Sequence, residues 1–316
     1  MKNAVSVALA FWIAAVVGVA GAPLKCTDVG AEPARLLHID FDAMRETYIG
    51  KYFLYELDKP EMHSNMVAFQ SIFSFDPRRQ LHGMTIYTAN STPDDSVVIT
   101  YADFEPARFV KLMTGGEGSF AITNNQHVIY SWIDTNKNSG DSEGVRKYAA
   151  ILDGRVLAGN SRLNVAGALA VVDGRAPSSS PEEVAKRFDP LVATNFVLAS
   201  AQNLEFLESN PKLAVLKLSK WVKLKASESN EVLKATLTVE AGDEQTALQM
   251  SQVAQGMITW LGLQKEDPWA TKLARGITVQ LEATGFRVEL SVSSKDAVAA
   301  LKAYNQKKNP PKQGEQ

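Results

Sequence analysis

The first half of the chain alternates strand patterns with helical ones. Apolar and polar side chains alternate over residues 37–41, the period of two that is typical of a half-buried strand. Asp42 stands where it would cap a helix over residues 43–57, and Pro60 stands at the start of a second helix. The rest of this half is predicted to form strands at 84–87, 97–101 and 128–133, a helix at 105–113, a hairpin at 148–157 and a helix at 165–172.

A polar stretch over residues 177–190 interrupts this pattern. Within it Ser180 and Glu183 have the spacing of a capping box, and Pro181 occupies the first helical position between them. The stretch is therefore predicted to be a linker with one short helix. We expect it to separate a first domain at 34–176 from a second domain at 191–305.

The second half repeats the element order of the first. A strand is expected at 196–199, a helical stretch at 204–216, strands at 221–226 and 232–239, a hairpin at 277–292 and a final helix at 296–304. Asp243 begins a long amphipathic helix whose predicted apolar face consists of Leu248, Val253, Met257, Ile258 and Leu261. The repeated order predicts an α+β fold of two similar ferredoxin-like sandwich units, each with an antiparallel sheet and helices on one face.

The N-terminus has the pattern of a secretory signal peptide at 1–22. A basic Lys2 precedes an apolar run over 4–20, and the small residues Ala20 and Ala22 offer two cleavage positions. Pro23 argues against cleavage after Ala22. A membrane anchor is the alternative, because the run has the lower length limit of a membrane span. With cleavage, we expect a periplasmic or secreted protein with no membrane span.

The segments next to the ends carry little regular pattern. Residues 23–33 are predicted to be an irregular leader, and the polar, lysine-containing tail at 306–316 is predicted to be disordered. The leader contains Cys26, the chain's single cysteine, so no intramolecular disulfide can form. A buried thiol, an intermolecular bridge and a lipidated cysteine remain as alternatives. The net charge of −2, from 33 basic and 35 acidic residues, argues against nucleic-acid binding.

Asp40 and Asp42 are candidate catalytic residues. A strand that ends in two aspartates one residue apart resembles the nucleophile strand of haloacid-dehalogenase-like phosphatases and the first metal-binding motif of translesion DNA polymerases. Met44 departs from both patterns, and the phosphatase's lysine and acidic partners are not found. The favoured interpretation is a strand that leads into a helix cap.

The candidate metal ligands lie in a polar loop. Asp134, Asn136, Asn138 and Asp141 alternate as in a calcium-binding loop. The glycine stands one position later than an EF-hand requires, and Val145 occupies the place of the bidentate glutamate. A hairpin loop without metal is the preferred interpretation. We expect no cofactor, with Ca²⁺ as the alternative.

Arg78 and Arg79 are candidate ligand-binding residues. They follow a turn at Phe75, Asp76 and Pro77, and paired guanidinium groups recognise carboxylates well. Two solvated charges are the simpler interpretation. A layout with this Asp-Pro-Arg turn between a helix and a strand resembles uncharacterised exported bacterial proteins, over most of the first half, and the resemblance implies no activity.

These observations favour a non-catalytic exported protein that binds a partner protein or an envelope component through sheet faces or loops. A hydrolase that uses Asp40 and Asp42 is the first alternative. A calcium-stabilised structural module is the second.

Overall fold

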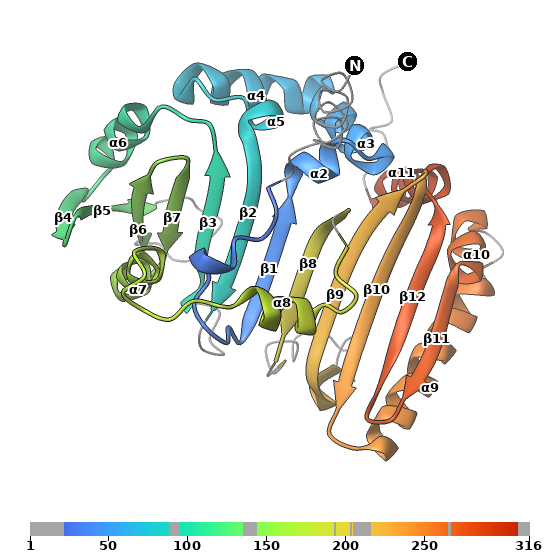
Figure 1. The fold of residues 1–316 in the computed structure, drawn as a ribbon. Coiled ribbons are helices and arrows are strands. Elements are labelled where there is room, and N and C mark those ends of the chain that lie inside the picture. The colour runs from blue at the N-terminus through green and yellow to red at the C-terminus, as the bar shows by residue number, and fades with distance from the viewer. Residues whose placement is uncertain are drawn as a thin grey trace, which may run out of the picture.

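The strands of this protein pair into one continuous antiparallel sheet. The structure, a computed structural model, describes residues 22–88, 95–134, 144–192, 194–202, 204, 216–264 and 267–308. Its twelve-stranded sheet has the order β11-β12-β10-β9-β8-β1-β2-β3-β7-β6-β5-β4 (Figure 1). The strands are β1 (Arg35–Asp40), β2 (Leu81–Thr88), β3 (Val97–Ala102), β4 (Phe120–Asn124), β5 (His127–Asp134), β6 (Val145–Leu152), β7 (Arg155–Gly159), β8 (Asn195–Ala201), β9 (Ser219–Ser229), β10 (Val232–Ala241), β11 (Ile277–Glu282) and β12 (Gly285–Ser293).

Helices lie at both ends of the sheet and on both of its faces. They are the 3₁₀ turn η2 (Cys26–Asp28) and the α-helices α2 (Phe41–Arg45), α3 (Tyr48–Leu57), α4 (Pro60–Phe73), α5 (Pro77–Gln80), α6 (Pro106–Gly115), α7 (Arg162–Val172), α8 (Pro181–Arg187), α9 (Glu244–Gly262), α10 (Pro268–Arg275) and α11 (Ser294–Lys308). The predicted antiparallel α+β class is therefore confirmed.

The pairing of β1 with β8 joins the two halves of the chain. Leu37 lies opposite Ala199, and Ile39 lies opposite Val197, in an antiparallel register. The expectation of two separate ferredoxin-like units is corrected by this seam, because strands from both halves form one sheet. Element order along the chain gave no indication that an edge of one half would pair with an edge of the other.

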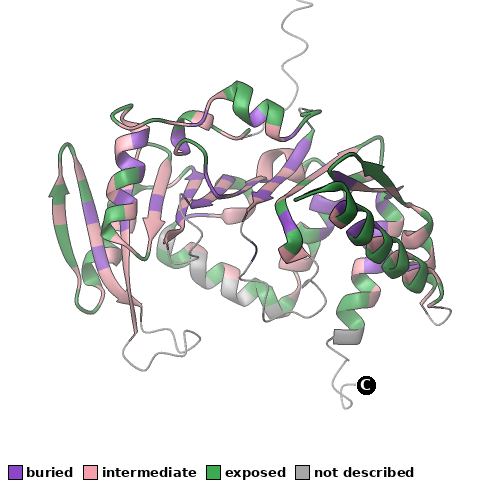
Figure 2. Cartoon of the chain, turned by 90° about the horizontal axis from the view of Figure 1, so that it is seen from below, coloured by how far each residue is buried: buried purple, intermediate pink, exposed green. Residues whose placement is uncertain are grey.

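The two halves bury opposite faces of the sheet. In the first half, Val165 and Leu169 of α7 pack into a core that includes Leu36 of β1. In the second half, Met250 of α9 packs on Val239 of β10, which lies on the face that carries Leu37. Figure 1 accordingly shows α7 in front of the sheet and α9 behind it. Figure 2 shows that buried residues concentrate in the central strands, whereas β4 and α9 carry many exposed positions.

The apolar face predicted for α9 is partly wrong. Ala247, Met250 and Ser251 are the helix's buried residues. Val253 and Met257 are 46% and 51% exposed. Helical spacing identifies an apolar stripe, but it does not show which side of the helix meets the sheet.

The helix predicted at 43–57 is divided into α2 and α3. Asp40 caps α2, in place of the predicted Asp42, and the side chain of Thr47 accepts a hydrogen bond from Gly50 N at the start of α3. A Cβ atom on residue 50 would lie 1.8 Å from the carbonyl oxygen of Met44, so this sharp break requires glycine there.

The stretch at 177–190 contains the predicted short helix, α8, with both hydrogen bonds of its capping box. At the C-terminal end, α11 continues to Lys308, which corrects the start of the predicted disordered tail at 306; the rest of that tail lies outside the described residues. The predicted signal peptide lies outside them as well, except for Ala22. Within the described ranges, the helices are all too short or too polar to cross a membrane.

The leader is anchored in the first half of the fold. Val29 is buried in the main core, and Gly30 forms a bridge with Ser178. Asp28 accepts hydrogen bonds from the Arg155 guanidinium at 2.6 Å and from the Tyr101 hydroxyl at 3.0 Å. Burial raises the pKa of Tyr101, so its hydroxyl stays protonated as the donor. Apart from the turn η2 and this single bridge the leader has no regular structure, and its buried side chains fix it to the first half.

Asp28→Ala is expected to lower the free energy of unfolding by about 2–4 kcal/mol, because it leaves the buried side of Arg155 without its counter-charge. Urea denaturation checks this value. Glu32→Gln, at an exposed position of the same leader, is the control and should change stability by less than about 0.5 kcal/mol. Equal effects of the two substitutions would contradict the anchoring role of Asp28.

Candidate functional site

Asp40 serves as a structural hydrogen-bond acceptor. Its side chain accepts from Ala43 N at 2.8 Å, which caps α2, and from Ala22 N at 3.0 Å. The residue is 3% exposed. Asp40 therefore makes the helix cap that was predicted for Asp42.

Asp42 belongs to a separate cluster with His82. The carboxylate receives a hydrogen bond from Arg45 at 2.6 Å and lies 2.9 Å from His82 Nδ1. The other ring nitrogen, Nε2, lies 3.0 Å from Asp103. Burial alone would lower the pKa of His82, but its hydrogen bonds to Asp103 and Asp42 outweigh burial and raise the pKa. The cluster therefore favours the protonated form of His82 between two carboxylates, and its contacts tie α2 to β2.

The two candidate arginines do not form a paired site. Arg78 donates to both carboxylate oxygens of Asp76 and, through Nη1, to Asp58 at 2.6 Å. These bonds lower the pKa of Asp76. Arg79 is exposed on the one-turn helix α5. The guanidinium of Arg78 thus has its partners within the protein.

Of the candidate calcium ligands, Asp134 is the last residue of β5. Asn136, Asn138 and Asp141 lie outside the described residues. Among the residues that the structure does describe, no three His, Cys, Asp or Glu side chains come together in a group able to hold a metal ion.

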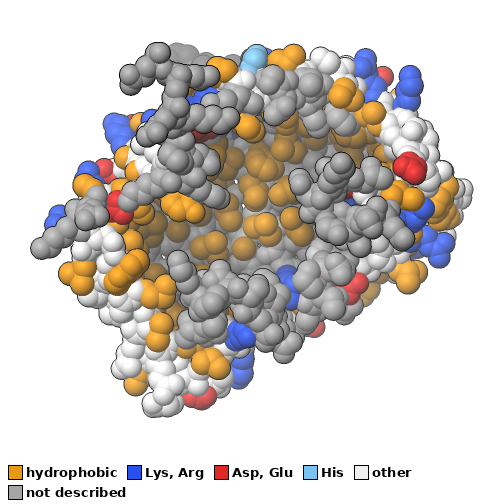
Figure 3. Space-filling model, turned by 180° about the vertical axis from the view of Figure 1, so that it is seen from behind, with side chains coloured by type: hydrophobic (Ala, Val, Ile, Leu, Met, Phe, Trp, Pro, Cys, Tyr) orange, Lys and Arg blue, Asp and Glu red, His pale blue; other side chains and the backbone are white. Residues whose placement is uncertain are grey.

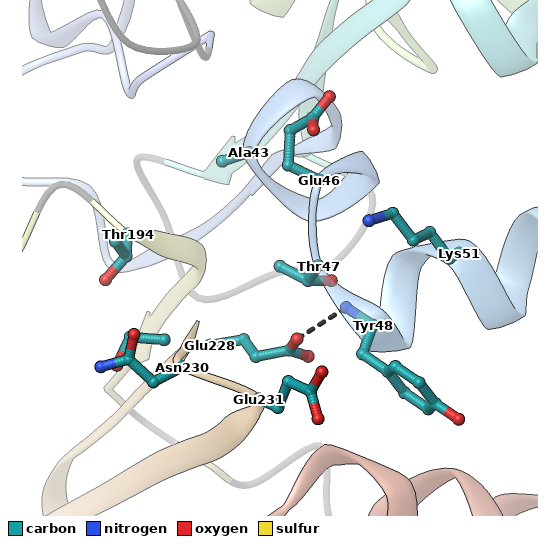
Figure 4. A pocket seen from close by; sticks show the side chains of 10 residues that line it. Ala43, Glu46, Thr47, Tyr48, Lys51, Thr194, Glu228, Asn230 and Glu231 are labelled. Atoms are coloured by element: carbon teal, nitrogen blue, oxygen red, sulfur yellow. Dashed lines mark hydrogen bonds between the residues drawn. The ribbon is translucent and has the colours of Figure 1, made fainter. Parts of the chain in front are cut away.

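A polar pocket of about 470 Å³ lies between the start of α3 and the β9–β10 turn (Figure 4). Glu228 is its central acidic group and accepts hydrogen bonds from the backbone nitrogens of Tyr48 at 2.6 Å and Ile49 at 3.2 Å. These nitrogens belong to the first turn of α3, where helices leave backbone donors unpaired. Glu228 therefore caps a helix from a distant strand.

A row of apolar side chains crosses the middle of the sheet. Leu37 lies opposite Ile86 of β2 on one side and Ala199 of β8 on the other. The row continues through Leu224 of β9 to Leu237 of β10. Since directly opposite residues share a face, these side chains project together on the face that carries α9 in the second half. Leu224 is 36% exposed in the interior of the sheet.

This row forms the floor of a hollow. One lobe, of about 380 Å³, includes Leu37, Ala199 and Leu224 in its lining. A second lobe, of about 1060 Å³, includes Ile39 and Val197, the next residues along the same face of the same strands. Residues two apart in a strand are about 7 Å apart, so the lobes adjoin. Figure 3 shows this surface from behind as a depression floored by hydrophobic side chains. We call the two lobes together the apolar hollow.

Charged groups gather in the second lobe. Glu56, Lys59 and Lys302 line it together with the aromatic residues Tyr52 and Tyr55. The Lys302 ammonium lies 5.4 Å from the centre of the Tyr52 ring, and Lys59 lies 2.7 Å from Glu56. Among the described residues that line the first lobe, the charged one is Arg35, and the others are apolar or uncharged. The hollow thus has an apolar floor, with two lysines and a glutamate in the second lobe and an arginine in the first.

Comparison with known proteins supports the fold alone. No protein-family model matches the sequence, and no curated protein matches it. Crystal form III of TP0453 from Treponema pallidum is similar in structure, with a TM-score of 0.50 and 9% identity over 89% of this chain and 99% of that one. Crystal form I of TP0453 aligns with a TM-score of 0.48 and 9% identity, covering 89% of this chain and 98% of that one. A bacterial protein therefore shares this fold, in line with the resemblance to bacterial proteins seen in the sequence.

Sequence reasoning missed both His82 and the floor of the hollow. His82 has no partner at metal-ligand spacing in the sequence, and only the pairing of β1 with β2 brings it to Asp42. The floor residues follow the alternation of strands, a signal that indicates one apolar face but not whether a helix covers it.

The cluster around His82 predicts a pH-dependent contribution to stability. The folded-state pKa is raised, so the contribution is present below the unfolded pKa of about 6.5 and is lost as pH rises through the folded pKa. His82→Gln is expected to destabilise the protein more at pH 5.5 than at pH 9, by up to about 1 kcal/mol, because the ring is partly exposed. Thermal unfolding at the two pH values checks this. A loss that does not change with pH would contradict it.

Proposed function

We propose that this chain is an exported, non-catalytic binding protein of the cell envelope, and that its apolar hollow holds the hydrocarbon chain of an amphiphile with an anionic head group. The observation that carries the proposal is the half-buried apolar row across strands of both halves, with Leu224 36% exposed in mid-sheet. Export rests on the signal-peptide pattern.

The position of the row favours a ligand that binds through side chains. The strands β2, β1, β8 and β9 each pair with a neighbour on both sides. Their backbone groups are therefore already hydrogen-bonded, and a peptide cannot add as a further strand there. Apolar area removed from water would stabilise a bound hydrocarbon chain by about 25 cal/mol per Å².

The basic side chains that line the hollow favour an amphiphile with an anionic head group over a wholly apolar molecule. Lys59 and Lys302 line the second lobe, where Glu56 is paired with Lys59 at 2.7 Å. A carboxylate or phosphate head in this lobe would gain from the lysines while its chain lies along Ile39 and Leu37. Ligand sites of this kind are mostly apolar with a few orienting polar groups.

The geometry of the aspartates supports binding over hydrolysis. Asp40 accepts hydrogen bonds from two backbone nitrogens, and the Asp42 carboxylate is hydrogen-bonded to Arg45 and His82. A general base or nucleophile needs access to substrate, and both of these carboxylates are occupied by structural partners.

Leu224→Glu is expected to weaken binding of dodecanoate at least about tenfold, because it places a carboxylate in the apolar floor. Isothermal titration calorimetry with the purified chain measures this. Leu163→Glu is the matched control, since Leu163 is 73% exposed on α7 at another site, and should leave affinity unchanged. Circular dichroism establishes that both variants are folded. No dodecanoate binding by the wild-type chain would overturn the proposal.

Lys302→Gln is expected to reduce the affinity for dodecanoate severalfold and to leave that for dodecanol almost unchanged, because only the former carries a charge. The difference should shrink at high salt, since an exposed lysine is screened. Lys234→Gln, at an exposed position on the opposite face of β10 from Leu237, is the control. An equal loss for both ligands would show that Lys302 contributes packing and does not recognise the head group.

A further inference from the structure

Ala22 is built into the folded domain by two backbone hydrogen bonds. Its N–H donates to Asp40 Oδ1 at 3.0 Å, and its carbonyl oxygen lies 3.0 Å from His38 Nε2. Asp40 and His38 are 3% and 1% exposed, so both partners are interior groups of β1. The residue that the sequence places at the very end of the signal peptide is therefore held by the core of the sheet.

The His38 ring is oriented for this contact from its other side. Its Nδ1 lies 2.9 Å from Oγ1 of Thr85, a fully buried residue of β2. Burial lowers the pKa of His38, so the ring is neutral and carries one N–H. With the hydroxyl of Thr85 donating to Nδ1, the ring's proton sits on Nε2 and is donated to Ala22. Without Ala22, this buried N–H would lose its acceptor.

The site also fits the side chain of residue 22. A Cβ atom on Gly83 would lie 3.2 Å from the Cβ of Ala22 and 3.4 Å from its carbonyl oxygen. The absence of a side chain at Gly83 leaves space for Ala22 against β2. The contact thus pairs a glycine at position 83 with a small side chain at position 22.

The sequence offers two cleavage positions that differ in whether Ala22 remains. Cleavage after Ala22 would remove it and would leave Pro23 first. Cleavage after Ala20, where Gly18 and Ala20 supply the small residues, would keep it. It would also place the new terminal ammonium on Gly21, one residue before the Ala22 amide that donates a hydrogen bond to the Asp40 carboxylate.

We infer that signal peptidase cleaves between Ala20 and Gly21, and that His38 and Asp40 form a seat for the N-terminus of the mature chain. Water is the co-reactant: the Ala20–Gly21 peptide bond breaks, hydroxide adds to the carbonyl carbon of Ala20, and the amine of Gly21 takes the proton. The inference rests on the predicted export signal and is independent of ligand binding in the apolar hollow.

The test is the intact mass and N-terminal sequence of the full-length chain, expressed with its own signal in a bacterium and purified from the exported fraction. We expect Gly21 as the first residue. A mature chain that begins at Pro23 or later, or one that keeps residues 1–20, would overturn the inference.

A second measurement tests the seat itself. Chains that begin at Gly21 and at Pro23 are compared by thermal unfolding, and the Pro23 chain is expected to unfold at lower temperature. His38→Gln is then introduced into both chains, and its effect should be smaller in the chain that lacks Ala22, because the two groups interact. Equal effects in both backgrounds would contradict the contact between Ala22 and His38.

Discussion

The backbone pairing of β1 with β8 is the constraint on which the rest of the architecture depends. It joins strands that come from opposite sides of the linker at 177–190 and fixes their register, with Leu37 opposite Ala199. A shift of one residue would turn every side chain of one strand to the other face. The row that floors the apolar hollow, and the core around Leu36 on the other side, therefore exist only in this register.

Local features of the fold follow from the sequence, whereas its assembly does not. The strand at 37–40 and the capping box at Ser180 and Glu183 are found as predicted, because each depends on residues a few positions apart. The strand nevertheless buries the polar His38 and Asp40, and Phe41 already belongs to α2. The pairing of β1 with β8 depends on edges far apart in the chain, which no local pattern encodes. For the same reason Val253 was expected on the buried side of α9, where Met250 lies instead.

The candidate site shows the same division. A helix cap was predicted at Asp42, at the end of the first strand, whereas Asp40 makes it. The cluster of Asp42 with His82 and the apolar row at Leu37 and Leu224 arise from strand neighbours, so they require the sheet order. A half-exposed leucine in the middle of a sheet has the same sequence signature as a buried one.

The position of the hollow across the seam has a consequence for the dynamics of the sheet. A molecule lying on Leu37, Ala199 and Leu224 would touch strands of both halves at once. By mass action, it would favour the state in which these strands are paired. Amide hydrogen exchange in β1 and β8 would then slow on binding, while exchange at the outer strand β4 would not change. Hydrogen exchange at the β1–β8 pairing would therefore show whether the apolar hollow is occupied.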